Sequence, residues 1–485
     1  MNSKIKVVII GAGMAGILAA LKLKQRGDVD FIVYEKAKAI GGTWLYNRYP
    51  GLTCDVPAHC YTYSFATNPE WSALYAPGDE IRGYFERIAD KYDVRRSIEL
   101  GVEVKACEWA DGRWTVVLDD GRIDHADVLI AASGVLHHPN IPQLPGMDRF
   151  EGPIFHSAQW DDEAKIDGAD VGVIGCGSTG VQIVSALSTR ARNLVHFCRT
   201  PQWIMPIRQR FYSEEEKSGF RADDKLIDAI RFGDKYQAVL RRFETAVTDP
   251  SSPEMEEIEK IVTDNLEESV RDPELREKLR PTYKAACKRL IFSGDYYESV
   301  QRPGVVVETG QIAEIEPRGV RMQDGQFYTL DTLVLATGFA VDRFVRPTRV
   351  TGVGGLTLDD AWGARPCAYY AISVPHFPNF FMLNGPTGPV GNFSLIDVAE
   401  SQWHYIEQLL DLLVKGEARR IEVRPSALEA YEAWRSAEAL KTAWATGCSS
   451  WYLDERGVPN TWPKGLPEFQ EAMAAPKMED YDFAS

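Results

Sequence analysis

The sequence has little that would hold together a small disulfide-rich or zinc-dependent fold. Its eight cysteines are scattered along the chain and include no Cys-x-x-Cys pair. This pattern indicates neither a disulfide framework nor a zinc knuckle. We therefore predict reduced thiols in a cytoplasmic protein, and no bound metal.

Long apolar runs are also missing. No stretch reaches the roughly 18 uninterrupted apolar residues that a membrane helix needs. The basic start of the chain, ahead of the apolar run 7–20, is similar to a signal peptide, but three glycines interrupt that run. We therefore interpret this run as part of the folded protein.

An excess of basic charge is lacking as well. The 54 Lys and Arg residues stand against 70 Asp and Glu residues, which leaves a formal net charge of −16. Such a surface repels polyanions, so we expect neither nucleic acid nor an anionic membrane as a partner. At 485 residues, 45% of them hydrophobic, the chain is long enough for two or more domains.

A dinucleotide-binding unit is predicted at the start of the chain. The β-branched run 6–10 is typical of a buried strand, and the fingerprint Gly11, Gly13 and Gly16 follows it directly. A helix pattern comes next, and a second strand ends at Glu35, nineteen residues after Gly16. These glycines allow the backbone to approach a pyrophosphate closely, and an acid at this offset binds ribose hydroxyls.

A second unit with the same pattern begins at Val171. Its fingerprint is Gly175, Gly177, Ser178, Thr179 and Gly180. At the offset where the first unit has Glu35, the second has Arg199. An acid repels a 2′-phosphate, whereas a guanidinium pairs with it through charge-assisted hydrogen bonds. We therefore predict that the first unit binds FAD and the second binds NADPH, with Thr200 and Lys288 as further phosphate ligands.

The segments around these units complete the predicted organisation. The loop 41–55 is rich in glycine, proline and aromatics, and we expect its Gly42, Thr43 and Trp44 to wrap a cofactor ring. The acidic, helix-patterned stretch 213–280 contains no strand pattern and predicts an inserted helical layer. Apolar runs at 114–118 and 128–132 predict strands of a small sheet.

The fold class follows from these elements. We predict an α/β protein with two Rossmann-like domains, of which the FAD-binding domain is discontinuous. Residues 1–145 and 336–485 would form that domain and the C-terminal tail. Residues 146–335 would form the NADPH-binding domain, with a helical insertion at about 210–285. The chain would return to the first domain at the small residues ending in Gly338, which we expect to contact a cofactor.

The joint between the two units carries a more specific motif, F-x-G-x-x-x-H-x-x-x-W-D. Its residues are Phe150, Gly152, His156, Trp160 and Asp161. With the two fingerprints, this motif resembles the type I Baeyer-Villiger monooxygenases over nearly the whole chain. The pattern G-G-x-W-x-x-x-x-Y-P-G-x-x-x-D at 41–55 and the Lys-Arg pair ahead of Asp-Tyr-Tyr-Glu at 288–298 are similar to further patterns of that family.

The resemblance implies a flavin that NADPH reduces and that then binds O2. The C4a-peroxyflavin formed in this way attacks a ketone, and an anionic tetrahedral adduct yields an ester or lactone. A fixed cation is needed beside these anions. Arg289 suits that role because its guanidinium does not deprotonate at working pH, and Asp55 is expected to orient it and to contact the cofactor. A buried structural ion pair is the alternative interpretation of these two residues.

Other residues of the resemblance carry weaker expectations. We expect His156 to be structural in the linker, without a proton-transfer step, and Trp160 to serve packing. The segment at Trp444 only loosely resembles the control loop of the family, so its role stays open. The substrate would be a small ketone together with O2, and the protein would be a monomer or homodimer.

Two other functions fit parts of the sequence. A flavin-containing monooxygenase that oxygenates nitrogen or sulfur is the alternative within flavoenzymes, although members of that group usually have Phe or Tyr in place of Trp160. Sulfoxidation would then be the main reaction and not a side activity. A redox-sensing protein that holds both cofactors without turnover is a third interpretation.

Overall fold

The predicted strand at the start of the chain lies in the middle of a five-stranded parallel sheet. The computed structural model describes residues 4–391 and 393–484. The strand order is β19-β7-β1-β2-β3, and every pairing is parallel. The strands are β1 (Lys6–Ile10), β2 (Asp30–Glu35), β3 (Ile98–Leu100), β7 (Val128–Ala131) and β19 (Phe380–Met382). Because β19 follows all the strands of the second sheet in the sequence, this unit is built from two separate parts of the chain.

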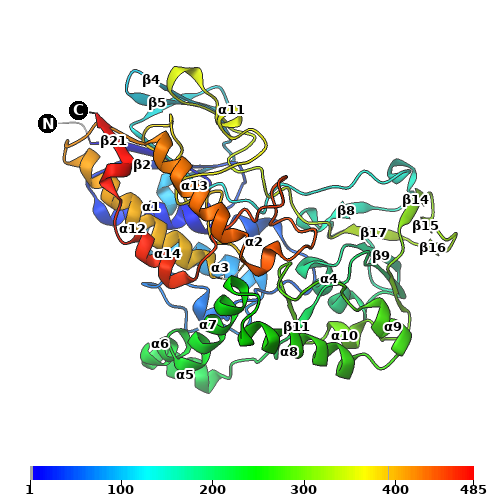
Figure 1. The fold of residues 1–485 in the computed structure, drawn as a ribbon. Coiled ribbons are helices and arrows are strands. Elements are labelled where there is room, and N and C mark those ends of the chain that lie inside the picture. The colour runs from blue at the N-terminus through cyan, green and yellow to red at the C-terminus, as the bar shows by residue number, and fades with distance from the viewer. Residues whose placement is uncertain (1–3, 392, 485) are drawn as a thin grey trace.

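A second five-stranded parallel sheet has the order β13-β10-β9-β17-β8. The strands are β8 (Ile154–His156), β9 (Asp170–Ile174), β10 (Asn193–Phe197), β13 (Val305–Glu308) and β17 (Thr332–Leu335). They are near-continuous apolar runs, as expected of strands covered on both faces. All of them lie between the two parts of the first unit in the sequence, and they occupy the opposite side of the molecule (Figure 1).

Helices from both ends of the chain cover the first sheet (Figure 1). α1 contacts both α3 and α12, and α12 contacts α14. The helices are α1 (Met14–Arg26), α3 (Gly78–Lys91), α12 (Leu395–Val414), α13 (Pro425–Ala439) and α14 (Leu466–Met473). The final strand β21 (Tyr481–Ala484) pairs antiparallel with β20 (Arg420–Val423). The two ends of the chain therefore form one layered core.

The predicted helical insertion is present and separates two short parallel strands, β11 (Ile204–Pro206) and β12 (Ile291–Ser293). Its helices are α5 (Glu214–Ala222), α6 (Lys225–Arg231), α7 (Asp234–Thr248), α8 (Pro253–Ser269) and α9 (Pro273–Lys278). Several begin at side-chain caps, of which the Ser213 capping box with Glu216 is complete. The insertion runs along the lower side of both units in Figure 1.

The prediction that residues 128–132 belong to a small sheet is wrong. Val128–Ala131 pairs with β1 and β19 inside the large parallel sheet. The small sheet instead consists of β18 (Arg349–Thr351), β4 (Val104–Ala110), β5 (Arg113–Leu118) and β6 (Ile123–Ala126). A short apolar run fits either sheet, so its pattern alone did not distinguish them.

Several shorter elements complete the chain. They are α2 (Thr43–Tyr46), α4 (Ser178–Leu187), α10 (Tyr296–Ser299), α11 (Leu358–Trp362) and the three-stranded sheet of β14 (Ile312–Glu316), β15 (Gly319–Met322) and β16 (Phe327–Thr329). The helix α2 lies inside the predicted loop 41–55.

The chain passes between the two units twice, and the two passages lie side by side. The N–H of Asn140 donates to the carbonyl of Gly338, and the N–H of Ala340 donates to the carbonyl of His138, both at 2.9 Å. Pro139 and Phe339 form an antiparallel bridge between these bonds. The units are thus joined by a paired connection, which we call the double crossing (residues 136–142 and 336–340).

The prediction that all thiols are reduced is wrong for one pair. Cys287 and Cys448 form a disulfide, although 161 residues separate them in the sequence. The other six cysteines are free. A pairing over such a distance leaves no spacing pattern, so the sequence did not indicate it. The bond joins the end of the helical insertion to the C-terminal segment.

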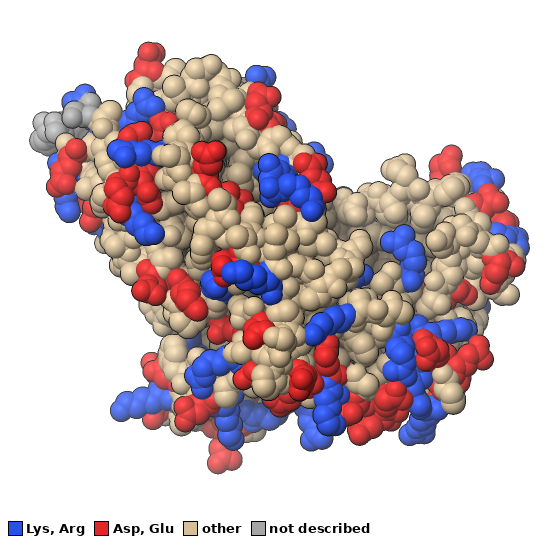
Figure 2. Space-filling view, in the orientation of Figure 1, with Lys and Arg blue, Asp and Glu red and all other residues tan. Residues whose placement is uncertain are grey.

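The predicted fold class is confirmed, with two Rossmann-like units, a discontinuous first unit and a helical insertion in the second. Among the described residues, no helix is long and apolar enough to cross a membrane. Within the same residues, no group of three His, Cys, Asp or Glu side chains is placed to hold a metal ion. On the face shown in Figure 2, acidic and basic side chains are interspersed.

Candidate active site

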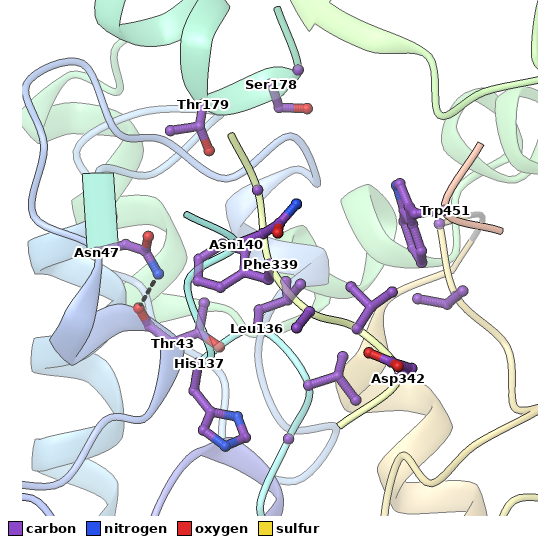
Figure 3. Close-up of a pocket in the computed structure, with 18 of the residues that line it drawn as sticks. Thr43, Asn47, Leu136, His137, Asn140, Ser178, Thr179, Phe339, Asp342 and Trp451 are labelled. Carbon is purple, nitrogen blue, oxygen red and sulfur yellow. Dashed lines mark hydrogen bonds between the residues drawn. The ribbon is translucent and has the colours of Figure 1, made fainter. Parts of the chain in front are cut away.

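A single cavity of about 1500 Å³ is lined by both glycine fingerprints. This volume exceeds the roughly 300–1000 Å³ that is typical of a pocket for one drug-sized ligand. In Figure 3, Thr43 reaches the cavity from the first unit, Ser178 and Thr179 from the second, and Trp451 from the C-terminal segment. Asn140 and Phe339 of the double crossing lie between them. The cavity is large enough for two cofactors and a small substrate.

The first fingerprint approaches its neighbours too closely for any side chain. Gly11 has φ +98°, and a Cβ on it would lie 2.8 Å from the carbonyl oxygen of Ala132. A Cβ on Gly16 would lie 1.9 Å from the carbonyl oxygen of Gly11, at the start of α1. The carboxylate of Glu35 accepts hydrogen bonds from the N–H of Ala12 at 2.7 Å and of Ala37 at 2.8 Å. Because Gly11 and Gly16 carry no side chains, the N-terminus of α1 is open to an anion.

The second fingerprint repeats this geometry. Gly175 has φ +116°, and its Cβ would lie 2.2 Å from the carbonyl oxygen of Ala336. A Cβ on Gly180 would lie 2.0 Å from the carbonyl oxygen of Gly175. The other fingerprint residues that line the cavity are Gly177, Ser178 and Thr179 at the start of α4. The two units therefore present equivalent helix N-termini to one cavity.

Two cations stand beside the second fingerprint. Arg199, Thr200 and Lys288 all line the cavity, and no salt bridge to Arg199 or Lys288 is found among the described residues. Burial lowers the pKa of Lys288, and the nearby charge of Arg199 lowers it further. The ammonium also lies 4.7 Å from the ring centroid of Tyr283. Two neighbouring cations without a carboxylate partner have the charge that a dianion such as a phosphate requires of its ligands.

Arg289 and Asp55 meet in the same cavity. The guanidinium Nη2 donates to Asp55 Oδ2 at 2.6 Å, and both side chains are partly exposed to the cavity. The charge of Asp55 raises the pKa of Arg289, so the guanidinium stays positive throughout the working range. Asp55 comes from the loop after the first fingerprint, whereas Arg289 comes from the second unit. The ion pair therefore bridges the two units.

The loop 41–55 packs directly on the first fingerprint. A Cβ on Gly42, which has φ +54°, would lie 2.9 Å from the Cα of Gly13. Thr43 and Trp44 begin the short helix α2 and line the cavity, where the indole N–H of Trp44 donates to the hydroxyl of Tyr61 at 3.3 Å. The strand end at Gly338, with φ +78°, also lines the cavity and has open space around its Cα.

None of the linker-motif residues lines the cavity. A Cβ on Gly152 would lie 2.2 Å from the carbonyl oxygen of Asp331, which explains the glycine. The ring of Trp160 packs edge-on against Phe155 at 5.1 Å. Asp161 accepts a hydrogen bond from the N–H of Glu163. Phe150 packs on the core of the second unit.

His156 is the linker residue with a connection to the cavity. Its Nδ1 accepts from the N–H of Ala158 at 3.1 Å, and its Nε2 lies 2.9 Å from the carbonyl oxygen of Gly338. With Nδ1 accepting, Nε2 carries the proton and donates to that carbonyl. Burial lowers the pKa of His156, so the neutral form is favoured. The imidazole thus holds the linker against the double crossing.

The C-terminal segment reaches the cavity with residues 449–455, which include Trp451 but not Trp444. The side chain of Trp444 is buried, packs on Tyr452 and does not line the cavity, whereas Trp451 is half exposed and lines it. The hydroxyl of Tyr452 lies beside the guanidinium of Arg289, since a Cβ on Gly391 would be 1.9 Å from Tyr452 Oη and 3.4 Å from Arg289 Nη1. Sequence analysis overlooked both Trp451 and Tyr452, because this segment has no periodicity that would show which aromatic side chains point inward.

Comparison with known proteins identifies the family. The model of the family described as flavin-binding monooxygenase-like matches residues 4–346. The chain belongs to this family. It is 35% identical to a Baeyer-Villiger monooxygenase of Streptomyces coelicolor over 489 residues, which covers 99% of this chain and 93% of the relative. An uncharacterized monooxygenase of Mycobacterium tuberculosis is 41% identical, with 98% and 95% covered.

Solved structures agree with this assignment. Cyclohexanone monooxygenase from Rhodococcus sp. Phi1, bound to NADP⁺, is similar with a TM-score of 0.88 and 30% identity, and all of both chains is covered. A structure described as OTEMO in complex with FAD and NADP is similar with a TM-score of 0.89 and 25% identity, again over both complete chains. The resemblance to the Baeyer-Villiger monooxygenases is confirmed, and this monooxygenase is an enzyme of that kind.

Proposed function

We propose that this monooxygenase uses FAD, NADPH and O2 to convert ketones into esters or lactones. The balanced reaction consumes one ketone, one O2, one NADPH and one proton, and yields the ester, NADP⁺ and water. The observation that carries the proposal is the Arg289–Asp55 ion pair inside a cavity that both fingerprints line. A permanent cation at this place suits a reaction whose oxygen nucleophile and adduct are both anionic.

FAD would be held by the first unit and NADPH by the second. Gly11, Gly13 and Gly16 would leave room for a pyrophosphate at the start of α1, and Glu35, which lines the cavity, would accept hydrogen bonds from the ribose hydroxyls. Trp44, with Gly42 and Thr43, would lie along the flavin. When bound, reduced flavin combines with O2 and supplies the oxygen that is inserted beside the carbonyl.

The second unit would recognise the 2′-phosphate of NADPH through Arg199, Thr200 and Lys288. A guanidinium and an ammonium without carboxylate partners bind a dianion, and they give no such advantage to the neutral 2′-hydroxyl of NADH. Gly175, Gly177, Ser178 and Thr179, which line the cavity, would surround the pyrophosphate, and Gly180 would allow the close approach of α4 to Gly175. Gly338 would contact a cofactor where the double crossing passes the cavity.

Arg289 would stabilise the negative oxygen that develops on the substrate. Its planar guanidinium has five N–H donors and uses one of them on Asp55 in this arrangement. Asp55 would orient the guanidinium and contact the cofactor. The linker residues would act outside the cavity, with His156 connecting the linker to the carbonyl of Gly338.

The test is incubation of the purified protein with NADPH, air and a panel of cyclic, linear and aromatic ketones and sulfides, followed by mass spectrometry. Esters or lactones that carry one added oxygen are the expected products. Oxides of sulfides or amines alone would instead assign the protein to the heteroatom-oxygenating group. NADPH consumption that no substrate stimulates would indicate a binding protein without turnover.

Three further features are part of this proposal. The first domain would consist of residues 1–145 and 336–485 and the second of residues 146–335, and the division of the strands between the two large sheets supports these boundaries. The protein would be a monomer or homodimer in the cytoplasm, acting on a small molecule. Size-exclusion chromatography with light scattering tests the oligomeric state.

A further inference from the structure

Tyr452 lies at the point where the C-terminal segment reaches the ion pair. Its side chain is 2% exposed, and its hydroxyl lies beside the guanidinium of Arg289, since both border the same point next to Gly391. Asp55 binds Nη2 of the same guanidinium. Arg289 therefore has two polar neighbours, a carboxylate from the loop 41–55 that binds it and a hydroxyl from the C-terminal segment that lies beside it.

We propose that Tyr452 is a positioning residue for Arg289 and that the Cys287–Cys448 disulfide keeps it there. A guanidinium held by one carboxylate oxygen can still rotate about that contact. A fixed polar group beside the guanidinium limits this rotation and determines in which direction the remaining N–H donors point. Only donors that already point at the developing oxygen anion stabilise it without reorganisation.

The backbone facing Tyr452 leaves space for its hydroxyl. A Cβ on Gly391 would lie 1.9 Å from Tyr452 Oη and 3.4 Å from Arg289 Nη1. Gly391 also has φ +89°, in the region that favours glycine. No larger residue at this position is compatible with the observed place of the hydroxyl.

The ring of Tyr452 is fixed by its own segment. It stacks on Trp451 with centroids 4.2 Å apart and packs on Trp444 at 5.4 Å. The N–H of Asn460 donates to the carbonyl of Tyr452 at 2.6 Å, and Leu453 and Pro459 form a bridge. The hydroxyl is therefore presented by a rigid turn and not by a freely moving loop.

The disulfide fixes this turn to the chain that carries Arg289. Cys287 precedes Arg289 by two residues and Cys448 precedes Tyr452 by four. The N–H of Cys448 also donates to the sulfur of Cys287 at 3.2 Å. Without the covalent bond, bringing the two segments together would carry the entropic cost of closing a long loop.

The inference rests on the proposed function for its catalytic readout. Tyr452→Phe retains the ring and removes the hydroxyl, so we expect ester formed per NADPH oxidised to fall roughly tenfold, the scale of one polar interaction with a charged group. The missing product should appear as hydrogen peroxide, while KM for NADPH and the melting temperature stay unchanged. Gly391→Ala should have the same effect, because its methyl group displaces the hydroxyl.

Tyr431→Phe is the matched control. Tyr431 is also buried in the C-terminal part, but its hydroxyl has no hydrogen-bond partner among the described residues and does not line the cavity. The yield of ester per NADPH oxidised by Tyr431→Phe should equal that of the wild type. A wild-type yield from Tyr452→Phe would overturn the positioning role.

The tether is tested on the protein without any turnover. Thiol titration of the unreduced, denatured chain should find the six free cysteines, and a count of eight would overturn the disulfide. The Cys287→Ser, Cys448→Ser double variant should be cleaved faster by trypsin after the exposed Arg456, and unchanged cleavage would contradict the tether. If the wild type forms no ester, the proposed function fails while these two measurements still decide the tether.

Discussion

Nη2 of Arg289 and Oδ2 of Asp55 are 2.6 Å apart, although 234 residues separate the two in the sequence. One comes from the unit that follows the linker and the other from the unit that precedes it. The contact therefore exists only when both units and the double crossing are in place. Arg289 and Asp55 each have a distinct role in the proposed reaction, and the two roles can be tested separately.

Arg289→Ala should abolish ester formation while the protein still binds flavin. The guanidinium supplies the charge for the anionic oxygen, whereas it touches neither glycine fingerprint. Product analysis and the flavin absorbance of the purified variant are the measurements. A normal ester yield from Arg289→Ala would remove the arginine from its assigned role, and Arg96→Ala, on the exposed surface, is the control.

Asp55→Asn should weaken the reaction without abolishing it. The amide has the same shape but no charge, so the guanidinium keeps a hydrogen-bond acceptor and loses the attraction that orients it. We expect ester formed per NADPH oxidised to fall roughly tenfold, comparable with the loss of one charge-assisted hydrogen bond. Assays of ester and hydrogen peroxide measure this ratio, and an unchanged ratio would contradict an orienting role.

Arg199→Ala should change nucleotide preference. The lost guanidinium binds a 2′-phosphate that only NADPH has, so KM for NADPH should rise roughly 10- to 100-fold, the range expected for hydrogen bonds to a charged group. KM for NADH should stay the same. Steady-state kinetics with both nucleotides give the comparison, and equal effects on both would refute the phosphate assignment.

Trp444 and Trp451 should respond differently to replacement by alanine. Trp444 is 3% exposed and sits in a packed cluster, so its loss should cost about 3–5 kcal/mol of unfolding free energy. Trp451 is 45% exposed and lines the cavity, so its loss should alter substrate or nucleotide KM with a smaller effect on stability. Denaturant unfolding and kinetics of both variants separate these outcomes.

Stability should fall in mild acid because of buried histidines. Burial, together with the charges of Arg231 and Arg210, lowers the pKa of His59 to about 4, and burial lowers the pKa of His196 to about 4. Near pH 5 the unfolded chain binds protons at these imidazoles and the folded chain does not. Stability is therefore complete above about pH 6.5 and is lost as the pH falls toward 4.

His59→Phe tests this acid dependence. Neither ring nitrogen of His59 has a hydrogen-bond partner among the described residues, and the ring lies between Tyr212 and Phe220. The variant should therefore be more stable than the wild type at pH 5 by about 2 kcal/mol and should lose less stability between pH 7.5 and 5. Urea unfolding at both pH values measures this, with the exposed His125→Gln as control. Identical pH slopes would contradict the assignment.

Local patterns predicted most of the fold, because a dinucleotide unit is defined by neighbouring residues. Gly11 to Gly16, Glu35 and Arg199 occupy the expected places, since strand, turn and helix follow one another directly. The sheet that contains Val128–Ala131 was not predictable, because that choice depends on β19, about 250 residues later. The Cys287–Cys448 bond and the inward direction of Tyr452 likewise depend on contacts between distant segments.

The motif around His156 shows a different limit of sequence analysis. Its residues lie behind the cavity wall, and His156 connects them to the carbonyl of Gly338 through a single hydrogen bond. A motif indicates that residues matter together, but it does not show on which side of a backbone they lie. Only the position of the second crossing segment, residues 336–340, shows on which side of the cavity wall the motif lies.

The double crossing has a mechanical consequence. Two hydrogen-bonded chain segments that lie side by side resist sliding past each other. The backbone dihedral angles of a few residues in them can still absorb a hinge rotation of one unit relative to the other. The Cys287–Cys448 disulfide is a further link between the units, so any change in the angle between them keeps these two cysteines together. Asp55 and Arg289 belong to different units, and a pair of spectroscopic labels near these two positions would read such a change of angle.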